Sequence, residues 1–348
     1  MTNLHPAYHL KDIRHYYGSK KVLDIDDLKI ETGSITGILG PNGSGKSTLL
    51  KLLAFARKPT TGQVFYKGRP EVPFSPTVRS KVTLLTQKPY LLKRTVFENI
   101  AYGLKIRNDK KNLEHRVKKA LLNVGLDYQS FAPRKWHELS GGEAQRVAMA
   151  ARLILKPEIL LLDEPIASVD TKSAKLIRQA SINARDNWGT TLVIVSHDVQ
   201  WLYSISDTQI AIFKGTIFST GMENIITGPF EKPDKKTVVK ILGDRQRITL
   251  KAPAQDSDTA VIRKKNISID PEKHSCTGMD NQSGTSNQLS GHIVSMLLEK
   301  KSGHIMTAIS IRDLSFTLRL SPHQIRNLDL YPGKSIVLKF HSNNVEWI

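Results

Sequence analysis

The chain has little cysteine, no long apolar run and few aromatic residues. Its single cysteine, Cys276, excludes an internal disulfide and a cysteine-ligated metal cluster, which fits a reducing cytosol. No uninterrupted apolar run approaches the ~20 residues that a membrane-spanning helix needs. Residues 1–11 lack the apolar centre of a signal peptide. We therefore expect a globular protein that neither crosses nor enters a membrane by itself.

Positive charge is in excess, with a formal net charge of +19, and most of it lies before residue 244. Such an excess of positive charge can bind nucleic acid, anionic lipid headgroups or a polyanionic ligand. The basic run between Lys105 and Lys119 has little aromatic interleaving, so it is a poor stacking platform for single strands. We favour a solvated helical face for that run.

The stretch that organises the chain is GPNGSGKST at residues 40–48, between an apolar run and a helical pattern. Its glycines let the backbone curl so that N–H groups point at a phosphate, and the following helix adds its positive N-terminal end. The pattern predicts a phosphate-binding loop, in which Lys46 reaches the β- and γ-phosphates and Ser47 holds Mg²⁺. The loop residues are Gly40, Pro41, Asn42, Gly43, Ser44, Gly45, Lys46, Ser47 and Thr48.

Further short apolar stretches end in polar side chains, namely Gln87, the pair Asp163 and Glu164, and His197. Two adjacent carboxylates are costly at the end of a buried strand unless something uses them. Asp163 suits the Mg²⁺ shell and Glu164 suits polarising a water for in-line attack on the γ-phosphate. Gln87 can reach the Mg²⁺ and the water if its strand lies beside the loop. The carboxyl ends of parallel strands meet at one sheet edge, so we expect these groups to converge.

A helical pattern from Thr95 to Trp136 predicts a helical subdomain at about residues 88–157. Within it, LSGGE at residues 139–143 opens a helix, with Ser140 as N-cap and the amides of Gly141 and Gly142 free to face an anion. Ahead of the phosphate loop, Tyr17 can stack on an adenine ring, although most tyrosines at strand ends only pack.

Together these motifs resemble, in order and spacing, the ATPase subunit of an ABC transporter over the first ~240 residues. The resemblance implies an α/β P-loop NTPase fold with ATP and Mg²⁺ as cofactors. It also implies a sandwich dimer, in which the signature loop of one subunit closes over ATP on the phosphate loop of the other. The motif residues that carry it are residues 40–48, Gln87, residues 139–143, Asp163, Glu164, Asp170 and His197.

The resemblance assigns roles to single residues. Tyr17 would stack on adenine, residues 43–48 would bind phosphate, Gln87 would sense the γ-phosphate, and His197 would hold the γ-phosphate and the water. Four residues would act across the dimer, with Ser140, Gly141 and Gly142 contacting the partner's ATP and Asp170 crossing the interface. Glu143 stands where the family often has Gln, and Ile166 where Thr or Ser is frequent. Neither touches the catalytic atoms, so we expect ATPase activity.

The partners follow from the same resemblance. They are a second copy of the chain, two integral-membrane permease subunits and, indirectly, an extracytoplasmic substrate-binding protein. The protein would lie peripherally on the cytoplasmic face of the inner membrane, with no nucleic acid bound. The excess charge suggests a nucleic-acid- or ribosome-associated ATPase as an alternative, but such proteins commonly carry two ATPase units or a long coiled coil. This chain shows one phosphate loop and no sustained heptads.

A length of 348 residues favours two domains. We expect the ATPase domain at residues 1–243 and a small all-β, OB-like barrel at residues 244–348, with a polar linker at about 270–291. The barrel is predicted from alternating segments and resembles the C-terminal oxyanion-binding-type (TOBE/MOP-like) barrel of molybdate and tungstate importers. Its strands are expected at residues 261–269, 292–298, 305–311, 314–320 and 335–340.

The cargo is the least determined point. Residues 340–343 read FHSN where the barrel family often has Lys-Ala-Ser/Thr. Both oxyanion binding and a role limited to dimer stabilisation therefore stay open for the barrel. Residues 39–55 and 163–174 look most like the tungstate branch, so tungstate is expected first and molybdate next. Sulfate, polyamine, sugar and iron importers share the same ATPase chemistry and remain alternatives.

Overall fold

The computed structural model divides into two compact units, Met1–Gly221 and Met222–Ile348. This division falls before the boundary expected after residue 243. The reason is that β11 (Asn224–Thr227) and β12 (Thr237–Ile241) pair with β14 (Thr259–Ile262) and β13 (Arg247–Lys251) of the second unit. The structure describes residues 5–167, 169–218, 223–243, 246–255, 257–271, 286–299 and 302–348.

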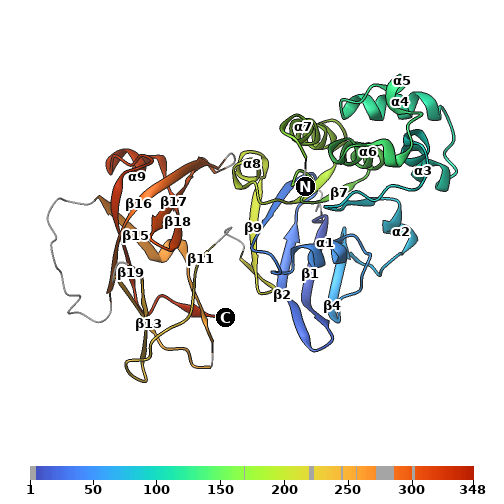
Figure 1. The fold of residues 1–348 in the computed structure, drawn as a ribbon. Helices are drawn as coiled ribbons and strands as arrows, with labels where there is room; N and C mark the ends of the chain where they lie inside the picture. The colour runs from blue at the N-terminus through green and yellow to red at the C-terminus, as the bar shows by residue number, and fades with distance from the viewer. Residues whose placement is uncertain are drawn as a thin grey trace. The chain divides into compact units, whose positions relative to one another are not determined.

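The first unit is built on one mixed sheet (Figure 1). Its strand order is β5-β4-β1-β2-β10-β9-β3-β8-β7-β6. The half from β9 to β6 is parallel, and β1, β2 and β4 form an antiparallel half. The strands are β1 (Tyr8–Tyr17), β2 (Lys20–Ile30), β3 (Ile35–Leu39), β4 (Thr61–Tyr66), β5 (Arg69–Pro70), β6 (Val82–Leu85), β7 (Ile159–Asp163), β8 (Thr191–Val195), β9 (Thr208–Phe213) and β10 (Thr216–Phe218).

Helices cover this sheet, and α3 to α6, which fall within the range expected for a helical subdomain, gather at one side of the unit (Figure 1). A capping box fixes the start of α3, where Thr95 and Glu98 each accept a backbone N–H of the other. None of the helices in the described ranges is both long enough and apolar enough to span a bilayer. The helices are α1 (Lys46–Leu53), α2 (Pro76–Arg79), α3 (Val96–Ile106), α4 (Leu113–Asn123), α5 (Tyr128–Phe131), α6 (Gly141–Leu153), α7 (Thr171–Trp188) and α8 (Val199–Ile205).

The second unit is the expected all-β, barrel-like fold, with antiparallel sheets around one apolar core that includes Phe316 and Leu338. Its largest sheet has the order β15-β19-β16-β17-β18. The expected linker at 270–291 is wrong at both ends, because Asp270 and Pro271 belong to β15 and β16 begins at Ser286. Residues 272–285 lie outside the described part. The remaining elements are β15 (Ile267–Pro271), β16 (Ser286–Leu298), β17 (Ile305–Ile311), β18 (Leu314–Leu320), α9 (Pro322–Asn327), β19 (Ser335–His341) and β20 (Glu346–Trp347).

Shortening a core leucine of β7 tests the packing of the first unit. Leu161 is fully buried, so Leu161→Ala should lower the free energy of unfolding by about 2–5 kcal/mol through lost burial and the cavity left behind. Chemical denaturation of the full chain measures it. Leu122→Ala is the matched control, because Leu122 is 73% exposed on α4 and its loss should cost less than about 0.5 kcal/mol. An equal loss of unfolding free energy in the two variants would contradict the burial of Leu161.

Candidate functional site

The predicted phosphate loop joins β3 to α1 in a conformation that needs glycine. Gly40 and Gly45 have φ of 145° and 110°. A Cβ on Gly40 would lie 2.2 Å from the carbonyl oxygen of Ile212, and one on Gly45 would lie 2.8 Å from that of Val22. Lys46 begins α1 and folds back, donating to the carbonyl oxygens of Gly40 at 2.7 Å and Pro41 at 2.8 Å. The loop is therefore curled, with its lysine held over it.

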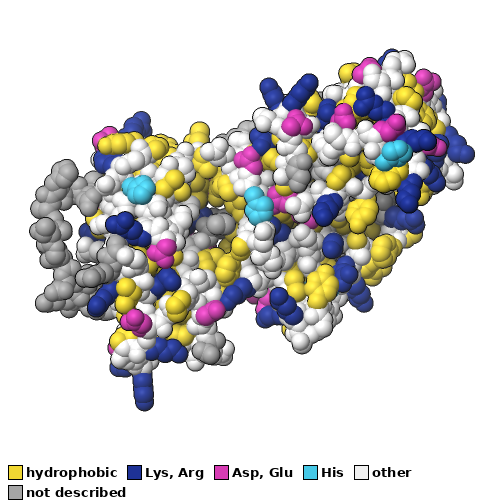
Figure 2. Space-filling view, viewed as in Figure 1, with side chains coloured by type: hydrophobic (Ala, Val, Ile, Leu, Met, Phe, Trp, Pro, Cys, Tyr) yellow, Lys and Arg dark blue, Asp and Glu magenta, His cyan; other side chains and the backbone are white. Residues whose placement is uncertain are grey.

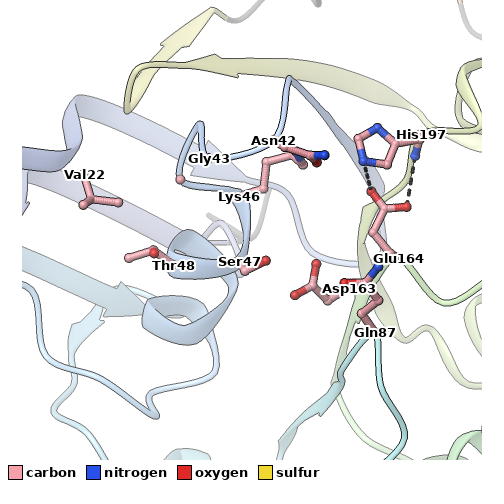
Figure 3. A pocket seen from close by; sticks show the side chains of 11 residues that line it. Val22, Asn42, Gly43, Lys46, Ser47, Thr48, Gln87, Asp163, Glu164 and His197 are labelled. Atoms are coloured by element: carbon pink, nitrogen blue, oxygen red, sulfur yellow. Dashed lines mark hydrogen bonds and ion pairs between the residues drawn. The ribbon is translucent and has the colours of Figure 1, made fainter. Parts of the chain in front are cut away.

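A pocket of about 270 Å³ lies at this loop and brings together groups from four strand ends (Figure 3). Among its lining residues Val22 was not predicted. It lies on β2, in the hairpin that also contains Tyr17. That hairpin is the one feature of the sequence that could have pointed to Val22. Outside the lining are Tyr17, Gly40, Pro41, Ser44, Ser140, Gly141, Gly142 and Asp170. The lining consists of Val22, Asn42, Gly43, Gly45, Lys46, Ser47, Thr48, Gln87, Asp163, Glu164 and His197.

The side chain of Glu164 is held by His197, which follows β8. Its Oε2 accepts the backbone N–H of His197 at 3.1 Å, and its Oε1 lies 3.2 Å from Nε2 of His197 (Figure 3). The residue is 7% exposed and has a φ of +48°, in the left-handed region that is costly for a residue with a Cβ. Strained backbone of this kind is concentrated at functional sites.

Asp163, Ser47 and Gln87 supply the oxygen ligands that Mg²⁺ prefers. Burial raises the pKa of Asp163, while a hydrogen bond from Ser47 and the charge of Lys46 oppose that shift. Burial likewise lowers the pKa of Lys46, against the nearby carboxylates of Glu164 and Asp163. Gln87 lines the same pocket. A half-buried carboxylate bonded to a hydroxyl, with a side-chain amide alongside, is a donor set that fits Mg²⁺.

The ring of Tyr17 lies beyond the pocket lining and is 41% exposed. The guanidinium of Arg57 covers one face of it at 4.9 Å from the ring centroid, and His15 packs against it at 5.1 Å in a T-shaped contact. Arg57 follows α1 and was not predicted from the sequence. An adenine ring stacked on Tyr17 would have to use the other face or displace Arg57.

The signature residues lie at the start of α6, outside the chain's own pocket. Ser140 and Glu143 form a capping box, in which Ser140 Oγ accepts from Glu143 N at 3.3 Å and Glu143 Oε2 accepts from Ser140 N at 2.8 Å. Asp170 caps α7 through Ser173, and a Cβ on Gly142 would lie 2.9 Å from Asp170 Oδ2. The helix N-termini of α6 and α7 therefore lie side by side.

Comparison with known proteins agrees with this geometry. The ABC transporter family matches residues 23–167. The ATP-binding protein of a tungstate uptake system from Peptoclostridium acidaminophilum is 37% identical over 209 residues, which are 60% of this chain and 95% of that protein. The chain belongs to the ABC transporter family. It is an ABC-type transport ATPase, and it binds ATP.

Other relatives of this ABC ATPase carry other names. A spermidine/putrescine import ATP-binding protein from Mesoplasma florum is 33% identical over 77% of this chain and 73% of that protein. Iron and sulfate/thiosulfate import ATP-binding proteins match at 32% and 31% identity. A solved dimeric ATP-binding cassette bound to ADP and phosphate is 28% identical, with a TM-score of 0.55 over 60% of this chain and 96% of that one.

Removing the ammonium of Lys46 should weaken ATP binding. Charge-assisted hydrogen bonds contribute ~1.5–3 kcal/mol, so Lys46→Ala should raise the Kd for ATP by roughly 10- to 100-fold. Calorimetric titration of the full chain measures it. Lys51→Ala is the control, because Lys51 is an exposed lysine of the same helix outside the pocket lining. Unchanged affinity in Lys46→Ala would contradict the assignment of the loop.

Proposed function

We propose that this chain is the ATP-hydrolysing subunit of an importer and that tungstate is its cargo. The observation that carries the hydrolytic part is the convergence of Lys46, Asp163, Glu164 and His197 in one pocket on the phosphate loop. A lysine and loop amides suit phosphate groups, and a buried carboxylate beside them suits the activation of water. The family supplies ATP as the nucleotide.

Each residue has a role in this proposal. The loop amides and Lys46 bind the phosphates, and Ser47, Asp163 and Gln87 hold Mg²⁺, whose charge would offset that building up on the γ-phosphate. Glu164 accepts a proton from the attacking water. His197 holds the Glu164 carboxylate through the contacts described above, so that the base faces the pocket, and it also holds the γ-phosphate.

Completion of the site requires a second copy of the chain. Ser140, Gly141 and Gly142 present the N-terminus of α6 but do not line the pocket of their own subunit. A helix N-terminus favours anions, so we propose that these residues close over ATP on the other subunit and that Asp170 crosses the interface. The similarity to a dimeric ATP-binding cassette supports a two-chain arrangement.

Exposed apolar side chains around α2 and α3 supply the docking surface for a permease. Tyr90 is 80% exposed and Phe74 is 71% exposed, with Leu92 and Tyr102 at 39%. Figure 2 shows hydrophobic side chains gathered over this part of the unit. Large exposed apolar groups mark interaction sites. We propose that two permease subunits dock here, which places the chain on the cytoplasmic face of the inner membrane, and that an extracytoplasmic binding protein delivers the cargo to them.

The choice of tungstate as the cargo is supported by sequence similarity in the first unit. The tungstate relative matches 60% of this chain but 95% of its own length, so little of it is left to form a counterpart of the second unit. The spermidine/putrescine relative matches 77% of this chain and therefore extends into that unit. Tungstate is favoured by the higher identity, and a polyamine is the second candidate because of the longer match.

Replacing the proposed base should stop hydrolysis and leave ATP binding intact. Glu164→Gln keeps the shape of the side chain but cannot take a proton, so ATP turnover should fall by at least ~100-fold. Size-exclusion chromatography with ATP should show a stable dimer of this variant. Glu143→Gln makes the same chemical change in the capping box, where an amide oxygen can still accept from Ser140, and should retain turnover. Full hydrolysis by Glu164→Gln would contradict the role of Glu164.

The cargo is tested by uptake in cells that carry either the unchanged chain or Glu164→Gln as their sole copy. We expect the variant to lose ATP-dependent accumulation of tungstate, measured by mass spectrometry, and to retain that of spermidine, iron and sulfate. Loss of spermidine uptake alone would overturn tungstate in favour of a polyamine. Since turnover of the purified protein is measured separately, a wrong cargo and a wrong catalytic assignment give different results.

A further inference from the structure

A second cavity, of about 330 Å³, lies in the first unit between α4 and the C-terminal ends of α6 and α7. It shares no lining residue with the pocket at the phosphate loop. Its volume falls in the range of small-molecule sites, ~300–1,000 Å³. It is lined by His115, Arg116, Lys119, Ala120, Asn123, Leu153, Ile154, Lys156 and Trp188.

One wall of this cavity is basic. His115 and Lys119 are four residues apart, so they share a face of α4, and Lys156 joins them from the loop after α6. Arg116 is paired with Asp109 at 2.6 Å. Within the described ranges, Lys119 and Lys156 have no acidic group within 4 Å, and the lining contains no acidic residue. Two exposed lysines without an acidic partner in the described ranges therefore line one cavity.

The other wall is apolar and aromatic. Ala120, Leu153 and Ile154 are all less than 9% exposed, and Trp188, the last residue of α7, is half-buried. The ammonium of Lys156 lies 6.0 Å from the centroid of the Trp188 ring. An indole beside an ammonium offers a surface on which a planar ring can pack while a charged group attached to it meets the lysine.

We propose that this cavity binds a small soluble phosphate monoester carried on a planar ring. A phosphate monoester has a charge of about −1.5 to −2 near neutral pH, which matches Lys119 and Lys156. The ring would pack on Trp188 and the buried aliphatic wall. The cavity shares no lining residue with the pocket at the phosphate loop, so it is a separate site. It also lies at the opposite end of α6 from the signature residues, and the 13 residues of that helix span ~20 Å.

The test titrates phenyl phosphate into the full chain by calorimetry. Lys119→Glu/Lys156→Glu should weaken binding by about tenfold or more, because both ionic contacts become repulsive. The matched control is Lys105→Glu/Lys118→Glu, which makes the same change of charge at exposed lysines outside the lining and should bind as the unchanged chain does. If both double variants bind phenyl phosphate as tightly as the unchanged chain, the proposed site is wrong. The site is also wrong if both variants lose the same amount of affinity.

Two further measurements distinguish the contribution of the phosphate group from that of the planar ring, and test whether phenyl phosphate binds at the phosphate loop instead. Trp188→Ala should weaken phenyl phosphate but leave the weaker binding of inorganic phosphate unchanged, and Trp188→Phe should restore most of the affinity if Ala disturbs the fold. Binding should persist in Lys46→Ala. Loss of binding in Lys46→Ala would place phenyl phosphate on the phosphate loop and overturn the proposal.

Discussion

Parallel pairing of β3, β8 and β7 is the constraint on which the ATP site depends. Val195 at the end of β8 pairs with Ile38 of β3 on one side and with Asp163 of β7 on the other. The three strands therefore end at the same level of the sheet. The phosphate loop, the carboxylate pair and His197 follow these ends directly, so one register places residues more than 150 positions apart in the chain around a single pocket.

The same pocket concentrates groups that burial disfavours. Lys46 and Glu164 are each less than 9% exposed, and burial moves the pKa of Lys46 down and that of Asp163 up. Opposite charges nearby offset part of this cost. Glu164 also carries a left-handed backbone, which the hydrogen bond of its N–H to the carbonyl of Val195 helps to hold. The pocket thus holds a buried lysine and a backbone-strained carboxylate in fixed positions, an arrangement typical of functional sites.

The helices α6 and α7 connect two different surfaces of the first unit. Their N-terminal ends carry the capping box of Ser140 and the cap of Asp170, which bind backbone amides within the chain. Their C-terminal ends, at Leu153 and Trp188, form walls of the basic cavity. The same two helices therefore contribute to both surfaces.

The sequence by itself determined the local chemistry: the glycine-dependent loop, the apolar strands that end in acids, the N-cap at Ser140 and the alternation of the second unit. Each depends on neighbours a few residues apart, so period and residue type suffice. Only the tertiary structure decided what depends on distant pairing. Val22 lines the pocket at the phosphate loop because of the hairpin, and Arg57 covers Tyr17 from the loop after α1. Residues 224–241 join the second unit because their strand partners lie there. The basic cavity likewise depends on tertiary packing, because it lies between α4 and the C-terminal ends of α6 and α7.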